Sequence, residues 1–302
     1  MKIENGRIYY GSSKRSAGEK AFDFFNIVFM LLLTAIYVVP ILLLVNSSFT
    51  ETSFLNQQGF SLIIPKFSLE YYKAIFSMES NQFVTSMLNS VLVVSSTIVI
   101  MVFTTTLAAH ALSRSKLQFK KLFSFFYIIP MLFAGGTIPY YLVMNDLGLV
   151  NSLWAIILPS GVSAWYIFLA KNSFLSIPES LFESAEIDGA NSFVILLKIT
   201  LPLGFPIIAT IILYTAVGVW NDWFQAALFL DSNHMNLWPV IAFVRRLQES
   251  PEFMQAYFGN TNLNTEGLRS ATVILSLLPI VMVYPFVQRF FIKGITTGAI
   301  KE

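Results

Sequence analysis

The chain has no cysteine among its 302 residues, and it has only two histidines. These counts exclude a disulfide framework, thiolate chemistry and a cysteine-based metal site. His110 and His234 lie far apart in the sequence, so we expect no histidine-based metal site. A GxxxxGK[ST] phosphate loop and a GxGxxG motif are also missing. If the protein depends on ATP, another chain must therefore bind it, and we expect no cofactor on this chain.

Charged residues are also scarce. They make up 12% of the chain, whereas a soluble domain carries about 25%. Hydrophobic residues make up 55%, and the mean hydropathy is +0.67. The formal net charge of +2 is too small to indicate a nucleic-acid partner. This composition predicts an integral membrane protein.

The sequence is rich in long apolar segments. A helix needs about 20 apolar residues to cross a bilayer core. Six windows meet this need, and they predict spans at 24–50, 84–110, 122–145, 149–171, 203–230 and 270–291. We therefore expect an all-α integral membrane protein with six transmembrane helices in a single domain over residues 1–302. Between the spans, 51–79 and 231–269 mix aromatic residues with Gly, Pro and Asn, which predicts short interfacial helices and loops.

Lysine and arginine are distributed unevenly between the segments that connect these spans. With the N-terminus inside, the inner segments hold 14 of the 19 basic residues. Basic residues concentrate in cytoplasmic segments, so we expect a multi-pass protein with both termini in the cytoplasm. The first apolar stretch is too long for a signal peptide and has no A-x-A cleavage site, so we expect it to be a retained anchor.

Residues 176–200 form an unusual polar loop on the predicted cytoplasmic side. Ser176 and Glu179 have the spacing of a capping box, which predicts a helix over about 177–187. Gly189 allows a positive φ, so the chain can turn before a second helix begins at "SFVILLKI". We expect two short helices at an angle, with small and acidic residues facing outward. The alternative is an ordinary amphipathic loop whose acids form a solvated face.

The stretch "ESAEIDGANSFVILLKITLP" (183–202) resembles a known signature. Permease subunits of bacterial ABC importers share the cytoplasmic pattern EAA-x3-G-x9-I-x-LP. The matching residues here are Glu183, Ala185, Gly189, Ile199, Leu201 and Pro202, with Ser184 in place of the middle alanine. Serine is also small, so a close contact is retained. The resemblance implies the type I ABC importer permease fold, with a coupling-helix loop at 176–200.

Three other stretches narrow the resemblance to maltose-type carbohydrate importers. They are "IIPKFSLEYYKAIF" (63–76), "GGTIPYYLVMNDLGLVNSLWAIILP" (135–159) and the tail "YPFVQRFFIKGITTGAIKE" (284–302). The likeness runs from about residue 20 to the end, and it is greatest to permeases for oligosaccharides or polysaccharide fragments in Gram-positive bacteria. Two alternatives remain open, a permease for a non-sugar solute and an ion-coupled secondary transporter. No catalytic cluster is visible in the spans, so we do not expect an enzyme.

The resemblance also implies partners in the bacterial cell membrane. They are a second homologous permease, an ABC ATPase dimer that holds ATP and Mg²⁺, and an extracellular or periplasmic sugar-binding protein that delivers the oligosaccharide. The coupling helix would lie in a cleft of the ATPase. The residues implied in that contact are Glu183, Ser184, Ala185, Asp188, Gly189, Ile199, Leu201 and Pro202.

"VGVWNDWFQAALFL" (217–230) contains an acid inside an apolar run. An ionisable residue at such a position is a functional hypothesis by default, and aromatic faces with polar side chains suit sugars. The family places the fourth and fifth spans along the translocation path. The candidate path residues are Trp165, Tyr166, Trp220, Asn221, Asp222 and Trp223. The alternative is that the tryptophans belong to the interfacial belt and that Asp222 only marks the end of a span.

Two further features concern the membrane segments. "FAGGTIPYY" (133–141) predicts a break in the third span that opens the pore, although Gly and Pro are tolerated in membrane helices without such a role. His110 ends the second span near a basic loop, and we interpret it as an interfacial residue and not as a proton relay.

Overall fold

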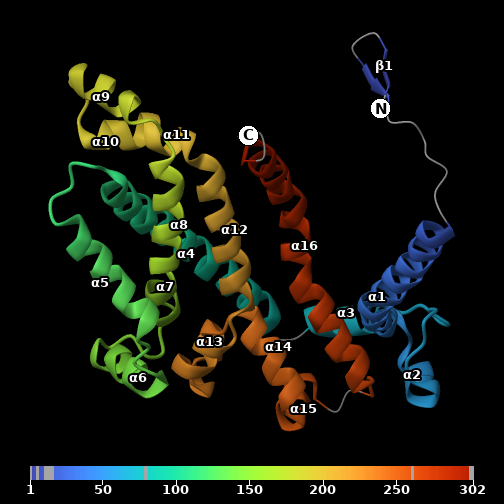
Figure 1. Cartoon of the computed structure of the whole chain (residues 1–302). Helices are drawn as coiled ribbons and strands as arrows, with labels where there is room; N and C mark the ends of the chain where they lie inside the picture. Colours follow the sequence, from blue (N-terminus) through green and yellow to red (C-terminus); the bar gives the residue numbers. More distant parts are fainter. Residues whose placement is uncertain (1, 5–6, 10–16, 78–80, 260–261, 299–302) are drawn as a thin grey trace. The chain divides into compact units, whose positions relative to one another are not determined.

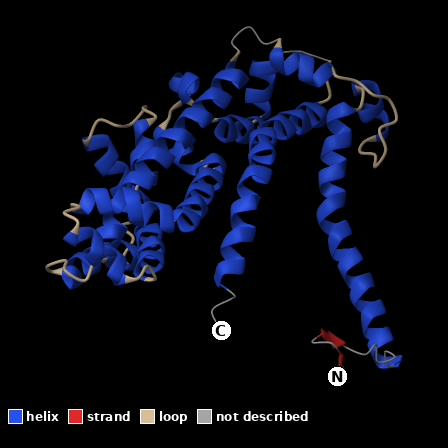
Figure 2. Cartoon of the chain, turned by 90° about the horizontal axis from the view of Figure 1, so that it is seen from above, coloured by secondary structure: helices blue, strands red, loops and turns tan. Residues whose placement is uncertain are grey.

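The chain is almost entirely helical in the computed structural model (Figure 1). The structure describes residues 2–4, 7–9, 17–77, 81–259 and 262–298, with side chains over 17–77, 81–259 and 262–283. Two short strands, β1 (Lys2–Glu4) and β2 (Arg7–Tyr9), pair antiparallel and are the red arrows of Figure 2. The predicted all-α class is confirmed for the body of the chain.

The helices vary widely in length. In chain order they are α1 (Ala17–Phe49), α2 (Thr52–Gln58), α3 (Glu70–Phe76), α4 (Gln82–Ser113), α5 (Lys120–Leu132), α6 (Thr137–Asp146), α7 (Trp154–Ser160), α8 (Ala164–Leu175), α9 (Glu179–Ile187), α10 (Ser192–Ile195), the π-helical η1 (Leu196–Thr200), α11 (Leu201–Leu203), α12 (Phe205–Asn221), α13 (Phe224–Phe229), the 3₁₀-helical η2 (Ser232–Leu237), α14 (Val240–Glu249), α15 (Pro251–Phe258) and α16 (Thr265–Gly298). The short helices α2, α3, η2, α14 and α15 lie in the two segments for which short helices and loops were predicted.

Four helices in the described part of the chain are long and apolar enough to span a membrane. They are 17–49, 82–113, 154–175 and 265–283. Two bent pairs meet the same test, 120–132 with 137–146 and 192–203 with 205–221, with bends of 116° and 79°. If the two helices of each bent pair together form one membrane span, the described part of the chain has up to six spans, the predicted number.

Three predicted spans differ from straight helices, and the span predicted at 149–171 contains α7 and most of α8 with a non-helical break at 161–163. The span predicted at 122–145 is broken after Leu132, and the chain restarts at Gly136, whose φ is +87°. The predicted break at "FAGGTIPYY" is therefore present, with a physical reason in the glycine conformation. The span predicted at 203–230 ends at Asn221, because Asp222 has an extended backbone and separates α12 from α13.

The chain divides into two units. The first contains 1–71 and 263–271, and the second contains 72–262 and 272–302. In the first unit, Tyr71 is fully buried, its hydroxyl lies 3.0 Å from Thr52 Oγ1, and Gly267 leaves no room for a Cβ beside its ring. This close approach ties the start of α16 to α3.

The core of the second unit is built around α4. Its buried face carries a stripe of small residues that includes Ser86, Ser90, Thr97 and Thr105. Small residues at helical spacing let helix backbones approach closely, and α7, α8 and α12 pack on α4. Helices α9–α11 lie at one end of α8 and α12, whereas α6, α13 and α14 lie toward the other end (Figure 1). The second unit therefore has polar segments at both ends of an apolar bundle.

Candidate functional site

The predicted turn at Gly189 is present, and it joins two short helices. Gly189 has a φ of +81° and follows the last residues of α9. The Gly189 N–H donates to the Glu186 carbonyl at 3.0 Å, and the Ala190 N–H donates to the Ala185 carbonyl at 2.9 Å. This pair of bonds is a Schellman motif, which ends a helix with a left-handed residue. Helix α10 then starts at once, because the Asn191 side chain accepts from the Val194 N–H.

The start of the first helix differs from the prediction. Ser176 does not cap α9, because it ends α8 and its Oγ donates to the Ser173 carbonyl at 2.7 Å. Pro178 occupies the N-cap position of α9 without a side-chain hydrogen bond. The predicted capping box is therefore wrong. The Glu179 carboxylate instead accepts a hydrogen bond from Ser115 Oγ at 2.7 Å.

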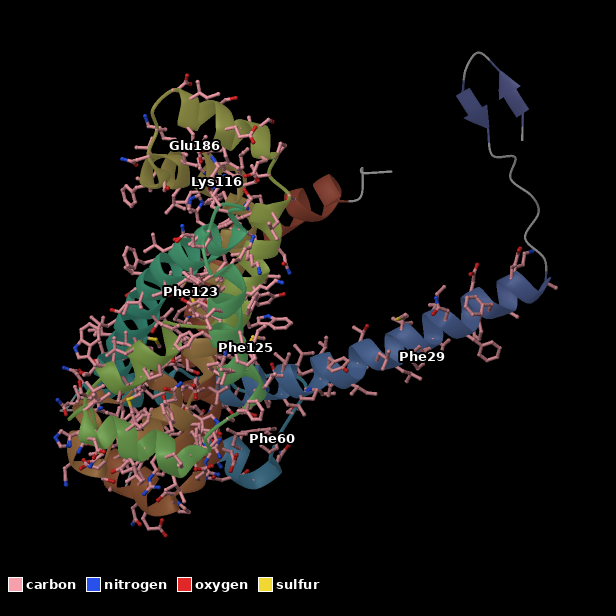
Figure 3. All side chains as sticks on the ribbon, turned by 60° about the vertical axis from the view of Figure 1, so that its left-hand side comes forward. Phe29, Phe60, Lys116, Phe123, Phe125 and Glu186 are labelled. Carbon is pink, nitrogen blue, oxygen red and sulfur yellow. The ribbon has the colours of Figure 1, made fainter. Side chains whose placement is uncertain are left out.

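The acids of α9 do not all face outward as predicted. Glu186 makes two ion pairs with the segment between α4 and α5, at 2.7 Å with Arg114 Nη2 and at 2.5 Å with Lys116 Nζ. Figure 3 labels Glu186 and Lys116 side by side at the end of the bundle. The Arg114 guanidinium also lies 4.0 Å from the centre of the buried Phe182 ring. We call Arg114, Lys116, Phe182 and Glu186 the α9 clamp.

The charged groups of the α9 clamp shift one another's pKa values. The hydrogen bond and charge of Lys116, together with those of Arg114, hold the pKa of the Glu186 carboxyl below its ordinary value. The same hydrogen bond from Glu186 raises the pKa of the Lys116 ammonium. Both shifts favour the charged forms, so both groups are charged at neutral pH.

The opposite face of α9 is exposed. Glu183, Ser184 and Asp188 are exposed, as predicted for a contact with another protein. Two large apolar residues of the same loop are also exposed, Ile187 at 86% on α9 and Phe193 at 60% on α10. We call these five residues the loop face. The prediction missed Ile187 and Phe193, although Ile187 lies four residues after Glu183 and therefore on the same side of the helix.

The second half of the loop is anchored in the bundle. Thr200 is fully buried, and its Oγ1 lies 3.0 Å from His110 Nδ1. The His110 ring, in the last turn of α4, is buried against η1, and its interpretation as an interfacial residue stays a prediction. Gly204 marks the 79° bend, and a Cβ there would lie 2.3 Å from Phe174 Cε1. Ala185, Ile199 and Leu201 are partly buried, while Pro202 is exposed.

A second polar site lies where α12 meets the turn between α7 and α8. A pocket of about 200 Å³ there has polar groups from Ser160, Ser163, Tyr166, Tyr214, Thr215 and Asp222. Tyr166 and Asp222 were predicted as path residues, and the fold brings them to one pocket from spans far apart in sequence. We call this pocket the α12 pocket.

Asp222 has two roles in this structure. Its Oδ1 accepts from the backbone N–H groups of Phe224 and Gln225 at 3.0 and 3.3 Å, which caps α13. Its Oδ2 accepts from Gln225 Nε2 at 3.1 Å. Gln225 also bonds Ser160 Oγ at 3.1 Å and Tyr140 Oη at 3.0 Å. Gln225 was missed by the sequence analysis, which gave no signal that this side chain joins α6, α7 and α12.

The other predicted path residues are not gathered at this pocket. Trp220 is buried, and its Nε1 donates to the Ser276 carbonyl of α16 at 3.2 Å. The Asn221 side chain returns to the Val217 carbonyl of its own helix. Trp165 is 63% exposed, and Trp223 lines a different cavity. Among the described residues, no group of three His, Asp or Glu side chains is placed to hold a metal ion.

Comparison with known proteins gives a consistent result. No family model matches the chain. The polygalacturonan/rhamnogalacturonan transport system permease protein YtcP of Bacillus subtilis is 36% identical, and the match covers 93% of this chain and 99% of the relative. Protein LplC of B. subtilis is 35% identical, over 93% and 95%.

A solved structure has the same fold. It is a crystal structure of a bacterial ABC transporter involved in the import of the acidic polysaccharide alginate. The matched chain is 28% identical with a TM-score of 0.83, and the match covers 93% of this chain and all of the other. The chain is thus more than 30% identical to a named transport permease over nearly its whole length. The chain therefore belongs to the family of ABC transporter permease subunits, which are multi-pass membrane proteins that leave ATP hydrolysis to partner ATPase chains.

Proposed function

We propose that this permease imports oligosaccharides released from polysaccharides, as one half of an ATP-driven, binding-protein-dependent importer. The observation that carries the proposal is the loop at 183–202, which is held by the ion pairs of the α9 clamp and also exposes the mixed acidic and apolar loop face. The names of the relatives support the substrate class, since they refer to polygalacturonan, rhamnogalacturonan and alginate.

In this proposal the loop face is the ATPase-coupling surface. Glu183, Ser184 and Asp188 supply small and polar contacts, and Ile187 and Phe193 supply apolar area to be covered. Ala185 and Gly189 shape the end of α9, while Ile199, Leu201 and Pro202 connect it to α12. Rigid-body motion of packed elements needs joints that do not deform, and the α9 clamp supports such a joint.

The proposal includes the partners and the orientation. A second homologous permease, two copies of an ABC ATPase that bind ATP and Mg²⁺, and an external sugar-binding protein complete the importer. Both termini and the loop face lie in the cytoplasm, since the basic residues concentrate on that side. The α12 pocket is the proposed sugar contact on the translocation path, because hydroxyl and carboxylate groups meet there beside tyrosine rings.

The absence of cysteine allows a clean test of the coupling surface. A single cysteine is placed at Ser184, and the chain is purified with its sister permease, ATPase and binding protein. A cross-link to a cysteine in the ATPase cleft is measured, together with the rise in ATP hydrolysis caused by oligosaccharide-loaded binding protein. Cysteine at exposed Ser77, in a predicted external segment, is the matched control.

The outcomes separate the candidate functions. Cross-linking at Ser184 alone, with sugar-stimulated hydrolysis, supports the whole proposal. Cross-linking without a response to any oligosaccharide retains the permease and rejects the sugar. Equal cross-linking at Ser77 and Ser184 contradicts the coupling surface.

A further inference from the structure

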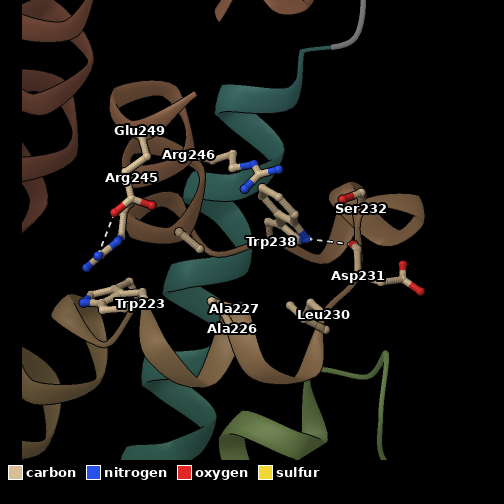
Figure 4. A pocket seen from close by; sticks show the side chains of 11 residues that line it. Trp223, Ala226, Ala227, Leu230, Asp231, Ser232, Trp238, Arg245, Arg246 and Glu249 are labelled. Atoms are coloured by element: carbon tan, nitrogen blue, oxygen red, sulfur yellow. Dashed lines mark hydrogen bonds and ion pairs between the residues drawn. The ribbon is translucent and has the colours of Figure 1, made fainter. Parts of the chain in front are cut away.

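A cavity separate from the α12 pocket lies among α13, η2 and α14. Its volume is about 290 Å³, near the lower end of the about 300–1,000 Å³ range of small-molecule pockets. That size suits one sugar unit of a longer chain. The side chains that can recognise a ligand are Trp223, Asp231, Trp238, Arg245, Arg246 and Glu249 (Figure 4). The residues belong to the predicted external segment and its border with α12.

The acids of the cavity are already engaged. The Asp231 carboxylate points away from the cavity (Figure 4). It lies 2.7 Å from His234 Nδ1 and accepts from Asn151 Nδ2 at 3.0 Å. Glu249 pairs with Arg245 Nη2 at 2.7 Å. The charge left facing the cavity is that of the exposed Arg246 guanidinium, which makes no ion pair of 4.0 Å or less among the described residues, although its charge helps to lower the pKa of the Glu252 carboxyl.

The aromatic groups complement this charge. The Arg245 guanidinium lies 3.1 Å from the centre of the Trp223 ring, which fixes both side chains. Arg246 lies beside Trp238 in Figure 4, and Trp238 is itself held by a 3.1 Å hydrogen bond from its Nε1 to the Asp231 carbonyl. Guanidinium groups bind carboxylates through two parallel hydrogen bonds. Trp223 is partly exposed and can offer apolar surface to a ligand, whereas Trp238 is buried and stacks on Phe253.

We propose that this cavity binds one uronate unit of an acidic oligosaccharide, with Arg246 on the sugar carboxylate and the partly exposed Trp223 beside the pyranose ring. The inference rests on the proposed oligosaccharide import and narrows its substrate class to carboxylated sugars. Arg245 keeps its pair with Glu249 and positions Trp223. The cavity discriminates by charge, because a neutral sugar of the same shape offers Arg246 no carboxylate for a bidentate ion pair.

The test compares two trisaccharides that differ only in charge. Trigalacturonate and carboxyl-reduced trigalacturonate are titrated against the purified full importer in nanodiscs, without binding protein, by saturation-transfer NMR. At about 0.1 M salt, where screening is moderate, the acidic sugar is expected to bind about tenfold more tightly, as befits one charge-assisted contact. Arg246→Gln is expected to remove the difference, and Arg246→Lys to keep part of it.

The control variant is Lys73→Gln, which removes one exposed positive charge from another predicted external segment. It is expected to leave the ratio of the two affinities unchanged. Equal binding of both sugars to the unaltered importer, or an unchanged ratio in Arg246→Gln, overturns the inference. Uptake of both sugars by proteoliposomes with binding protein is measured in parallel. Transport without discrimination overturns only the uronate site, whereas no transport and no stimulated ATP hydrolysis with either sugar overturns the proposed function as well.

Discussion

Arg114 joins two segments that are 72 residues apart, because its Nη2 donates to Glu186 Oε1 at 2.7 Å while its guanidinium covers Phe182. Arg114 immediately follows the last residue of α4, the helix on which α7, α8 and α12 pack. This contact therefore links α9 to the end of the helix around which the second unit is packed. The first prediction concerns this contact.

Arg114→Gln is expected to weaken coupling more than Lys116→Gln. The Arg114 side chain is 13% exposed and that of Lys116 is 68% exposed, and exposed ion pairs contribute little. Sugar-stimulated ATP hydrolysis of the reconstituted importer should fall by roughly 2- to 30-fold for Arg114→Gln, the range for residues that carry coupling between sites. Arg114→Lys should not restore it, since lysine lacks the planar group that covers Phe182.

The matched control for this series is Lys121→Gln, which removes an exposed charge from the same predicted cytoplasmic segment. It should leave stimulated hydrolysis unchanged. An equal effect of Lys116→Gln and Arg114→Gln would mean that net charge, and not the packing of the Arg114 guanidinium on Phe182, determines the coupling to ATP hydrolysis.

The attachment of α9 should depend on pH only outside the neutral range. The pKa of Glu186 is held below its ordinary value of 4.5, so its contribution is present above that value and is lost as pH falls through the lower, folded-state pKa. The pKa of Lys116 is raised above 10.5, so its contribution is lost only as pH rises through that higher value. A spin label on cysteine at Ser184 should therefore show constant mobility between these limits and a rise at acid pH.

Glu186→Gln serves as the control for this titration. It should raise the label's mobility at neutral pH and remove the acid transition. An acid transition that persists in Glu186→Gln would assign the titration to another carboxylate of the loop.

The left-handed residue that ends α9 gives a third prediction. A Cβ at Gly189 meets no atom within 4 Å, so substitution there introduces backbone strain without a clash. That strain costs about 1–2 kcal/mol for most residues and less for asparagine. The Ala190 amide hydrogen is hydrogen-bonded to the Ala185 carbonyl. Its exchange with solvent should be slowest with glycine at position 189, faster in Gly189→Asn and fastest in Gly189→Ala. Gly218→Ala adds a methyl group in open space without positive φ and should leave this exchange unchanged.

The two roles of Asp222 can be separated by substitution. Asp222→Asn keeps an oxygen that caps α13 but loses an acceptor for Gln225 Nε2, so transport should fall while thermal stability is retained. Asp222→Ala loses both functions, and the lost cap should cost about 0.5–2 kcal/mol. Melting temperature and uptake rate are the measurements. If Asp222→Ala melts at the temperature of the unaltered protein, the capping role is wrong.

A double-mutant cycle tests whether the α12 pocket acts as one network. Asp222→Asn and Gln225→Ala both break the same hydrogen bond, so their effects on uptake should be less than additive. Strictly additive losses would show that the two side chains act independently, against the role of Gln225 proposed from the structure.

The sequence determined the features that follow from local chemistry. Apolar windows of about 20 residues predict membrane helices because an unsatisfied backbone is excluded from lipid. The helix end at Gly189 was predictable because only glycine adopts its φ without strain. The break near Gly136 and the acid at Asp222 were visible as interruptions of apolar runs. The resemblance of 183–202 to the importer signature added the family, which the relatives confirm.

Tertiary structure decided which side chains meet. The residues around Ser176 gave no sign that it would end α8. Glu186 pairs with Arg114 and Lys116, and His110 contacts Thr200; these partners are 70–90 residues away, so local sequence could not show them. The α12 pocket and the cavity at Arg246 likewise exist only where helices from distant segments pack together. Local patterns fix where helices begin and end, whereas long-range packing fixes which polar groups are buried and must be paired.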